Sequence, residues 1–433
     1  MRGLKRIAES GRAVCATIHQ PSITIFNDFD SLLLLKRGGE VVFFGELGVD
    51  SCKLIQYFER YDSTEKIRPG ENPATWMLTT TGAGSSTSSA AKPFDYAGSY
   101  ADSTLRATAL KRIDDFTTNP VEEGKVLFAN KFATSKGTQR TVFLQRITKI
   151  YWRSPSYNTV RLLVSAIVAL LFGSVYASQR IPENESDMNS RVTSIYITFL
   201  FLSVNAFNTV LAIYEIERNM FYRHKAALMY SEQSIILGFT VAEFPFILLA
   251  SLVFCICFYF LVGFSTVAYK FFLYYLFFTL NLGLWTFAGQ MMMTLVKDAQ
   301  TAQGFGGLLV SLTSLFAGLL IRPQSITGFW VFMYWIMPGH YVLEGLLASQ
   351  FHNDVTPIMA TAGSPFYSSL GCDLGVPGSE ECVGTSEQWI LSSFGGFFVW
   401  EHIPFNIVYL VGMLITVRTI TYFALVKLNY LAK

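Results

Sequence analysis

SIILGFTVAEFPFILLASLVFCICFYFLV, residues 234–262, is the stretch that decides the class of fold. Its only charged side chain is Glu243. An α-helix rises about 1.5 Å per residue, so about 20 consecutive apolar residues cross the hydrocarbon core of a bilayer. This run is longer than that, and it therefore predicts a membrane-spanning helix.

Five further apolar stretches lie around it. They predict spans at 159–177, 192–214, 270–296, 302–321 and 403–427. A seventh stretch, 329–348, is broken by Pro338-Gly339, which favours a re-entrant hairpin over a full span. We therefore expect an α-helical membrane domain of six spans over residues 158–433, with an outer loop at 349–402.

The composition of the chain excludes several classes of protein. Of its 433 residues, 51% are hydrophobic and only 15% are charged, against about 25% charged in soluble domains. Disorder requires low hydrophobicity and high charge, so it is excluded. Six cysteines are too few for a disulfide scaffold of this length, and a net charge of +2 gives no reason to expect a nucleic-acid partner.

Basic residues predict the orientation in the membrane, because cytosolic loops are rich in Lys and Arg. Of the 33 Lys and Arg residues, 22 lie in residues 1–161, and there are none from Pro323 through Val417. With no signal peptide in the first 20 residues, both ends of the domain are expected in the cytosol. Three basic residues fall on the predicted outer side as exceptions: Arg180, Arg191 and Lys270.

The polar part before the spans has signals of regular structure. The run AVCATI at 13–18 predicts a buried strand, residues 31–35 and 40–44 around Gly38-Gly39 predict a hairpin, and 51–61 predicts a helix. Residues 82–138 are expected to be a linker, Gly/Ser-rich at 82–93, with a polar helix at 96–116. Residues 139–157 mix aromatic and basic side chains, which suits a helix in the membrane interface.

Two groups of residues in the spans are candidates for function. A cavity for a hydrophobic substrate needs an apolar lining with a few polar anchors. Six residues in two of the spans fit this description: Asn205, Phe207, Asn208, Val310, Ser311 and Ser314. Ordinary helix packing is the alternative interpretation. Glu243 is interpreted either as a buried polar hinge or as an interfacial carboxylate.

The predicted outer segments hold further candidates. Cys372 and Cys382 are expected to pair in an oxidising compartment, the alternative being two free thiols. Asn184 begins a glycosylation sequon, although its place beside the membrane disfavours modification. The histidines of this side, His340, His352 and His402, lack ligand spacing, so we expect no metal site and no metal-dependent transferase.

His19 follows the predicted strand and precedes Gln20-Pro21-Ser22. A histidine at a sheet edge can donate a hydrogen bond to a γ-phosphate and orient water, but a lone histidine is more often a plain loop residue. Its neighbours change that balance. IHQPS, FDSLLLL at 29–35 and KRGGEVVFFGELG at 36–48 closely resemble the end of a nucleotide-binding domain in G subfamily ATP-binding cassette transporters.

The resemblance continues along the chain in the same order. NPATWML at 72–78 resembles the segment after that domain in full-length transporters of the pleiotropic drug resistance type, in their second half. ERNMFYR at 217–223, continuing to AALMYS at 226–231, resembles their loop between the second and third spans, and AGLL at 317–320 resembles the end of their fifth span. Together these matches cover nearly the whole chain.

The resemblance implies a fold and a function. Residues 1–81 would be the C-terminal part of a nucleotide-binding domain, and residues 158–433 a six-helix ABC-2 type exporter domain. His19 would be the switch histidine of a completed ATP site, Leu319 and Leu320 a plug below the exit, and the second and fifth spans the cavity walls. The transporter would use ATP and Mg²⁺ to move amphipathic, lipid-like or xenobiotic compounds, by default in the plasma membrane and otherwise in a vacuolar or other endomembrane.

Ionisable groups at a membrane are costly, so those at the inner end of the second span are further candidates: Glu215, Glu217, Arg218 and Arg223. Acid–base pairs among them would stiffen the contact that receives motion from the ATP domain. A plain interfacial anchor is the alternative interpretation.

One departure from the family pattern limits the activity of this chain. An ATP site needs a glycine-rich phosphate loop with Lys and an acidic residue for Mg²⁺. The sequence contains no G-x-x-x-x-G-K-[ST], and the signature and catalytic acidic strand are absent as well. We therefore expect a chain that begins partway through the nucleotide domain, does not hydrolyse ATP by itself and needs a separate half with nucleotide-binding domains. The alternative is a non-catalytic membrane subunit or a truncated gene product that assembles with other halves.

Overall fold

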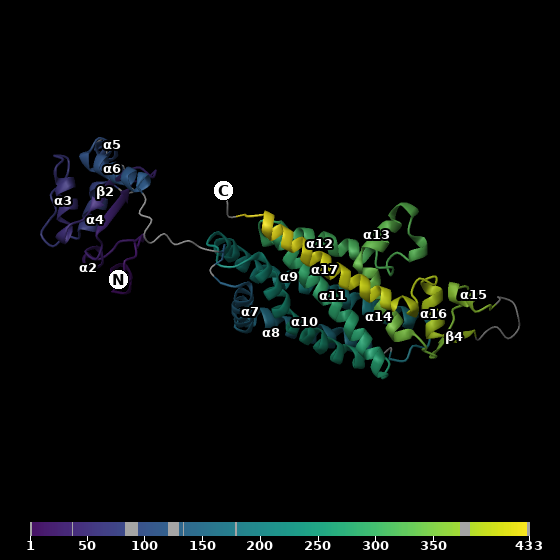
Figure 1. Ribbon diagram of the computed structural model, residues 1–433. Helices are drawn as coiled ribbons and strands as arrows, with labels where there is room; N and C mark the ends of the chain where they lie inside the picture. Colours follow the sequence, from purple (N-terminus) through teal and green to yellow (C-terminus); the bar gives the residue numbers. More distant parts are fainter. Residues whose placement is uncertain are drawn as a thin grey trace. The chain divides into compact units, whose positions relative to one another are not determined.

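The computed structural model describes residues 2–36, 38–82, 94–119, 130–132, 134–177, 180–372 and 382–430. They belong to two compact units, Met1–Leu127 and Phe128–Lys433 (Figure 1). The Gly/Ser-rich stretch predicted as a linker falls, apart from Gly82, outside the described residues.

A hairpin lies at the centre of the first unit. Strands β1 (Ser31–Leu35) and β2 (Val41–Glu46) pair antiparallel, with Leu33 opposite Phe44, so the predicted hairpin is confirmed. In the turn, Gly38 and Gly39 have φ angles of +105° and +86°. Residues other than glycine rarely adopt these backbone angles, which explains why two glycines occupy the turn.

The helices of the first unit surround this hairpin. Their bounds are α1 (Arg2–Glu9), α2 (Ile23–Phe26), α3 (Cys52–Glu59), α4 (Pro73–Thr80), α5 (Tyr96–Ala101) and α6 (Thr104–Thr118), with a 3-10 turn at Val49–Ser51. The helix predicted at 51–61 is confirmed as α3. Its Phe58 is fully buried and packs edge to face against Tyr57, Trp76 and Tyr96.

Two predictions for the first unit are corrected. Residues 96–116 are helical, but α5 and α6 pack against β2 instead of forming part of a separate linker. Residues 13–18 are exposed and form no strand. Within the described part of this unit β1 and β2 pair only with each other, so no neighbouring strand satisfies the hydrogen bonds of 13–18.

The second unit is a bundle of long helices. Its helices have these bounds: α7 (Lys136–Trp152), α8 (Pro155–Val175), α9 (Glu185–Ala226), α10 (Glu232–Val262), α11 (Ala268–Leu295), α12 (Ala299–Leu315), α13 (Val331–Ile336), α14 (Pro338–Phe351), α15 (Pro365–Ser369), α16 (Ser386–Ser393) and α17 (Ile403–Lys427). The residues predicted as an interfacial helix, 139–157, fall on α7 and the start of α8.

Five helices in the described chain are long and apolar enough to cross a membrane: α8, α9, α10, α11 and α17. Five of the six predicted spans therefore correspond to such helices. In α11 the most apolar window is 67% buried inside the protein, against 28% in α8. Apolar side chains such as Ile167 on α8 and Val408 on α17 are exposed on the surface of the bundle. An apolar surface of this kind requires lipid, so the protein is an integral membrane protein.

The predicted span at 302–321 differs from its structure. Helix α12 has 17 residues and ends at Leu315. After it, Gly318 has a φ angle of +96°, which is incompatible with a helix that continues to Leu319. The stretch predicted to be broken at Pro338 is divided there into α13 and α14, because Pro338 begins the second helix where its missing N–H costs nothing.

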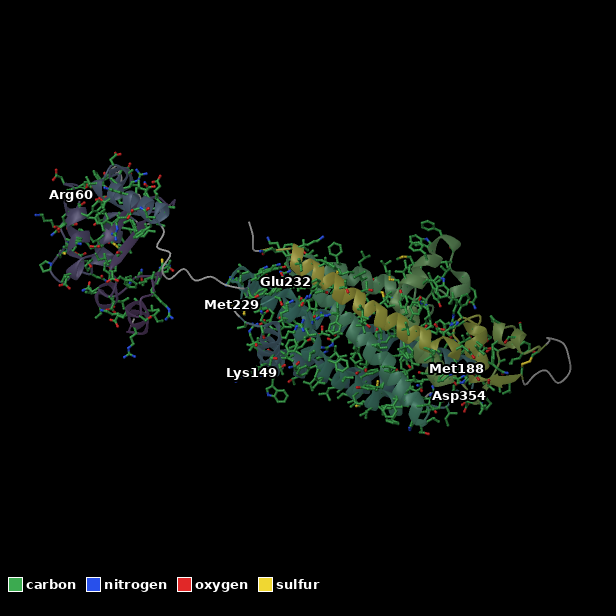
Figure 2. All side chains as sticks on the ribbon, viewed as in Figure 1. Arg60, Lys149, Met188, Met229, Glu232 and Asp354 are labelled. Atoms are coloured by element: carbon green, nitrogen blue, oxygen red, sulfur yellow. A yellow bond between two sulfur atoms is a disulfide. The ribbon has the colours of Figure 1, made fainter. Side chains whose placement is uncertain are left out.

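The two ends of the bundle differ in structure. Figure 2 shows Lys149, Met229 and Glu232 at one end, here called the basic end, and Met188 and Asp354 at the other. The latter end carries the hairpin of β3 (Pro357–Met359) and β4 (Val383–Thr385), α15, α16 and a disulfide between Cys372 and Cys382. We call it the disulfide end. The predicted outer loop is thus a small folded element in its described part.

Candidate functional site

A cavity of about 540 Å³ lies between α9 and α12. Four of the six residues proposed from the sequence for a substrate cavity line it: Phe207 and Asn208 from α9, and Val310 and Ser311 from α12. Asn208 and Ser311 are exposed there, whereas the Phe207 ring is only 2% exposed. Side chains far apart in the sequence therefore form one lining that is mostly apolar and has a few polar groups.

The remaining lining residues could not be chosen from the sequence: Val204, Gln303, Gly306 and Gly307. Gly306 is the most informative, because a Cβ atom there would overlap the Phe207 ring. The two helices can approach closely only at a residue without a side chain. The glycines in the run 304–307 indicate that another helix can approach closely here. A pattern of small residues alone does not show which helix that is.

Two of the six predicted cavity residues do not line the cavity. The Ser314 hydroxyl lies 2.6 Å from the Tyr196 hydroxyl, which also donates to the Ser314 carbonyl at 3.0 Å. Ser314 therefore joins α12 to α9. Asn205 is half-buried on α9, and its carbonyl accepts a hydrogen bond from Thr209 at 2.8 Å.

The charged residues predicted to couple motion find partners other than one another. Glu217 is buried and accepts a hydrogen bond from Arg146 of α7 at 2.7 Å. Arg218, 1% exposed, donates to the backbone carbonyls of Met293, Val296 and Lys297. The expectation that these charges pair within residues 215–223 is therefore wrong for Glu217 and Arg218.

The geometry of α9 explains this difference. A helix points successive side chains in directions about 100° apart, so Glu217 and Arg218 face different neighbours. Arg218 reaches the last turn of α11, where carbonyls lack helical partners and a cation is favoured. Glu215 is half-buried and Arg223 exposed. The sequence does not show which elements this segment of α9 contacts, and its role in coupling stays a prediction.

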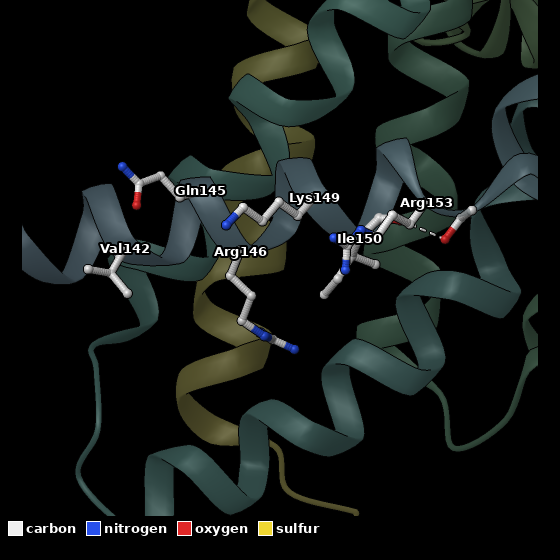
Figure 3. Close-up of a pocket in the computed structure, with 7 residues that line it drawn as sticks. Val142, Gln145, Arg146, Lys149, Ile150 and Arg153 are labelled. Carbon is white, nitrogen blue, oxygen red and sulfur yellow. Dashed lines mark hydrogen bonds between the residues drawn. The ribbon is translucent and has the colours of Figure 1, made fainter.

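Helix α7 presents basic side chains along a shallow cavity of about 620 Å³ (Figure 3). Arg146, Lys149 and Arg153 line it, together with Val142, Gln145, Ile150 and Ser154. The spacing of three or four residues places the three cations on one side of the helix. Arg146 has the carboxylate of Glu217 as a partner, and Lys149 and Arg153 are exposed. The basic end of the bundle therefore has a cationic groove.

Glu243 lies at the centre of a buried polar cluster. It is 0% exposed, and its carboxylate is 3.2 Å from the Arg161 guanidinium. The same carboxylate accepts hydrogen bonds from Tyr151 at 2.9 Å, Tyr157 at 2.7 Å and Gln290 at 3.2 Å. Of the two interpretations of Glu243, its burial favours the buried polar group over the interfacial carboxylate, and its role as a hinge stays a prediction.

The polar cluster extends to a fifth helix. Arg418 of α17 donates to the Gln290 side chain at 2.6 Å and to the Thr240 hydroxyl at 2.6 Å. Arg161 donates to the Thr286 hydroxyl. The cluster therefore joins α7, α8, α10, α11 and α17 by hydrogen bonds. The sequence does not predict the inward direction of Arg161 and Arg418, because nothing local shows that a cation at a span end turns into the bundle.

The other residues singled out from the sequence have these places. His19 is exposed in irregular backbone and lies at no sheet edge, contrary to the expectation. Leu319 is half-buried and Leu320 is 61% exposed, both beyond the end of α12. Asn184 caps α9, its side-chain oxygen accepting the Asp187 N–H at 3.0 Å. No three His, Cys, Asp or Glu side chains come together as metal ligands among the described residues.

Comparison with known proteins gives the family context. Residues 138–351 match the family described as ABC-2 type transporter. The chain is 35% identical over 357 residues to ABC transporter G family member 53 of Oryza sativa subsp. japonica, covering 82% of this chain and 24% of that protein. It is 33% identical over 368 residues to G family member 36 of Arabidopsis thaliana, covering 84% and 25%. The chain thus spans about a quarter of the length of these relatives.

Proposed function

We propose that the second unit is the membrane domain of an ATP-driven exporter, because residues 138–351 match the ABC-2 type transporter family and the chain is similar to G family ABC transporters. The proposed transporter is of the pleiotropic drug resistance type, and this chain corresponds to its C-terminal portion. Its substrates are amphipathic, lipid-like or xenobiotic compounds. We place it in the plasma membrane, with the basic end of the bundle in the cytosol.

The observation that carries this proposal is the cavity between α9 and α12. Its volume of about 540 Å³ lies within the range of about 300–1,000 Å³ typical of small-molecule sites. Val204 and Val310 offer apolar contacts, while Asn208 and Ser311 offer a small number of hydrogen bonds. Such a lining binds many hydrophobic molecules and rejects few, which suits an exporter of broad range.

In this proposal α12 also crosses the bilayer as the sixth span, since its 17 residues lie at the short end of the range of about 17–25 residues for spanning helices. Leu319 and Leu320, in the turn that follows, would close the route between the cavity and the disulfide end. Their positions after Gly318 allow them to move without bending a helix.

The inner half of α9 offers a mechanical path to the cavity. The helix is continuous from Glu185 to Ala226, so it contains both Glu217 and Phe207. Arg146 ties it to α7, and Arg218 ties it to the end of α11. A displacement of α7 at the basic end would therefore move the cavity wall. In this proposal α9, as the cavity wall, has two positions. Nucleotide bound to the nucleotide-binding domains would favour one of them.

The residues of this chain do not fit an ATP–Mg²⁺ site by themselves. The sequence has no phosphate loop, and His19 is exposed on irregular backbone that is not part of either hairpin strand. We therefore propose that both are bound mainly by a partner half with nucleotide-binding domains. His19 would contribute only to a site that the partner completes.

Flux measurements in proteoliposomes test the proposal. The full chain is reconstituted with a partner half that binds ATP, and export of a fluorescent amphiphile is followed with and without ATP. Ser311→Leu fills the cavity and should lower ATP-dependent flux roughly ten-fold, the usual effect of misfit in an apolar pocket. Ser174→Leu, at an exposed position of α8, is the matched control. The proposal is contradicted if the flux needs no ATP or if Ser311→Leu leaves the flux unchanged.

One alternative to this proposal is a non-catalytic membrane subunit that assembles with other halves. The same proteoliposomes separate the two. If the chain co-purifies with the partner but Ser311→Leu leaves the flux of the assembly unchanged, the chain supports assembly and does not form the route.

A further inference from the structure

Three basic side chains meet in one cavity at the disulfide end. Arg180 precedes α9, Arg191 lies in the second turn of α9 and Lys270 in the first turn of α11, and all three line a cavity of about 540 Å³. These three residues are the exceptions to the rule that Lys and Arg gather on the cytosolic side, because they fall on the predicted outer side. The structure places all three at one cavity.

Neutral backbone groups hold these cations in place. Arg180 donates to the Phe260 carbonyl at 3.2 Å and Arg191 to the Gly263 carbonyl at 2.8 Å, both at the end of α10. Lys270 donates to the carbonyls of Gln350 and His352 at 2.9 and 2.7 Å. These carbonyls at helix ends favour a nearby cation but do not cancel its charge.

The cavity therefore has an excess of positive charge. The carboxylate among its described lining residues is that of Asp354, which accepts hydrogen bonds from the backbone and hydroxyl of Thr356 at 3.1 and 2.6 Å. Arg191 is 5% exposed, and its Nε atom is buried without a hydrogen-bond acceptor among the described residues. A buried donor of this kind indicates a missing acceptor.

The start of α11 adds to the attraction for an anion. The helix begins at Ala268 beside the cavity, and no side chain in the described chain caps it. The first N–H groups of a helix have no partners within it and carry partial positive charge. Together with Arg191 and Lys270, they give several donors to a single anionic group.

Apolar surface surrounds the same opening. Ile181, Val267 and Tyr269 line the cavity and are 75%, 45% and 45% exposed. Phe260 and Phe272 nearby in the chain are 48% and 64% exposed. Aromatic side chains at a span end suit the interface of the membrane, where head groups meet acyl chains. A free ion would make no use of this surface, whereas a lipid would cover it.

We propose that this cavity binds the phosphate group of a membrane phospholipid, with an acyl chain along the exposed aromatic side chains of α10 and α11. Arg180, Arg191 and Lys270 donate to the phosphate oxygens. The proposal depends on the second unit spanning a bilayer, and it does not depend on transport or on nucleotide. Inorganic phosphate offers the same oxygens, so the test includes it.

Lipid binding to the purified full chain tests the inference. Native mass spectrometry of the protein in detergent, titrated with phosphatidylglycerol, gives the number of bound lipids and their Kd. Arg180→Gln and Lys270→Gln should each weaken one binding event about five-fold, the usual effect of one basic residue on an anionic lipid. Arg180→Lys keeps the charge and should retain the affinity. Lys297→Gln, an exposed lysine before α12, is the matched control and should change nothing.

Three results would overturn the assignment. The first is an unchanged Kd in both Arg180→Gln and Lys270→Gln. The second is binding of a neutral diacylglycerol as tight as that of phosphatidylglycerol. The third is displacement of the lipid by millimolar inorganic phosphate, which would assign the cavity to the free ion. The lipid measurement uses no partner and no ATP, so its outcome is separate from that of the flux assay.

Discussion

The carboxylate of Glu243 shows how single residues decide the structure of this bundle. A charge in the interior of a membrane domain is costly unless it is paired and hydrogen-bonded. Glu243 has Arg161 as its ion-pair partner and three further donors, so its charge is compensated within the protein. The position of Arg161, 2% exposed, depends equally on Glu243.

Removing one charge of this pair should destabilise the second unit strongly. Glu243→Gln leaves the Arg161 guanidinium buried without a counter-charge, and we expect a loss of about 3–5 kcal/mol in the free energy of unfolding. Thermal or denaturant unfolding of the purified chain in detergent measures it. Glu215→Gln, half-buried on α9, is the control and should cost much less.

The double variant Arg161→Gln/Glu243→Gln distinguishes an ion pair from simple packing. If the two charges depend on each other, the double variant should be more stable than the sum of the single losses by about 1–3 kcal/mol. Strictly additive losses would contradict the pairing.

One ion pair between α7 and α9 should contribute measurably to the free energy of unfolding. Arg146 and Glu217 are 2.7 Å apart, with side chains 30% and 5% exposed. Glu217→Gln should lower the free energy of unfolding by about 1.5–3 kcal/mol, the usual size for a hydrogen bond to a charged group. The exchange Arg146→Glu/Glu217→Arg should recover part of the loss. No recovery would mean that Glu217 acts through other contacts.

Among the helices, close approach depends on glycine. Gly238 of α10 faces Phe143 of α7, and a Cβ atom at this position would overlap the Phe143 ring. Gly306 makes the same kind of contact between α12 and Phe207 of α9. Glycines inside apolar stretches therefore determine the distances between these helices.

Gly238→Ala should separate α7 from α10. Overpacking of this kind costs about 1–3 kcal/mol, whereas Gly→Ala in an unobstructed helix usually stabilises. Gly412→Ala on α17 is the control, because its Cβ would meet no atom within 4 Å. Unfolding in detergent compares the two. Phe143→Leu in the Gly238→Ala background should recover stability, and failure to recover would contradict the assigned contact.

Elements with strong local signals were predicted well. The hairpin of β1 and β2 follows from two apolar runs around Gly-Gly, and five spans follow from hydrophobic length alone. Elements that depend on distant partners were not. A strand at 13–18 needs a neighbour, and the described first unit provides none. The end of α12 at Leu315 and the turn through Gly318 lie inside one apolar stretch, so hydropathy alone does not indicate them.

The orientation of the whole molecule can be tested with its own cysteines. Cys15 and Cys52 are exposed in the first unit, and Cys372 and Cys382 form the disulfide of the second. In intact cells, after mild reduction, a membrane-impermeant maleimide should label Cys372 and Cys382. It should label Cys15 and Cys52 only after permeabilisation. The reverse pattern would place the disulfide end in the cytosol and contradict the proposed topology.

The sequence by itself determined the membrane-spanning class of this protein, the hairpin and the place of its helices, because these follow from local hydrophobicity and turn chemistry. It also pointed to four residues of the cavity. Only the tertiary structure decided what each charge contacts: Arg146 with Glu217, Arg161 with Glu243, and three basic side chains in one cavity. The physical reason is that a buried charge pairs with groups on whichever helix lies beside it. A partner that is distant in the sequence cannot be identified from the residues around the charge.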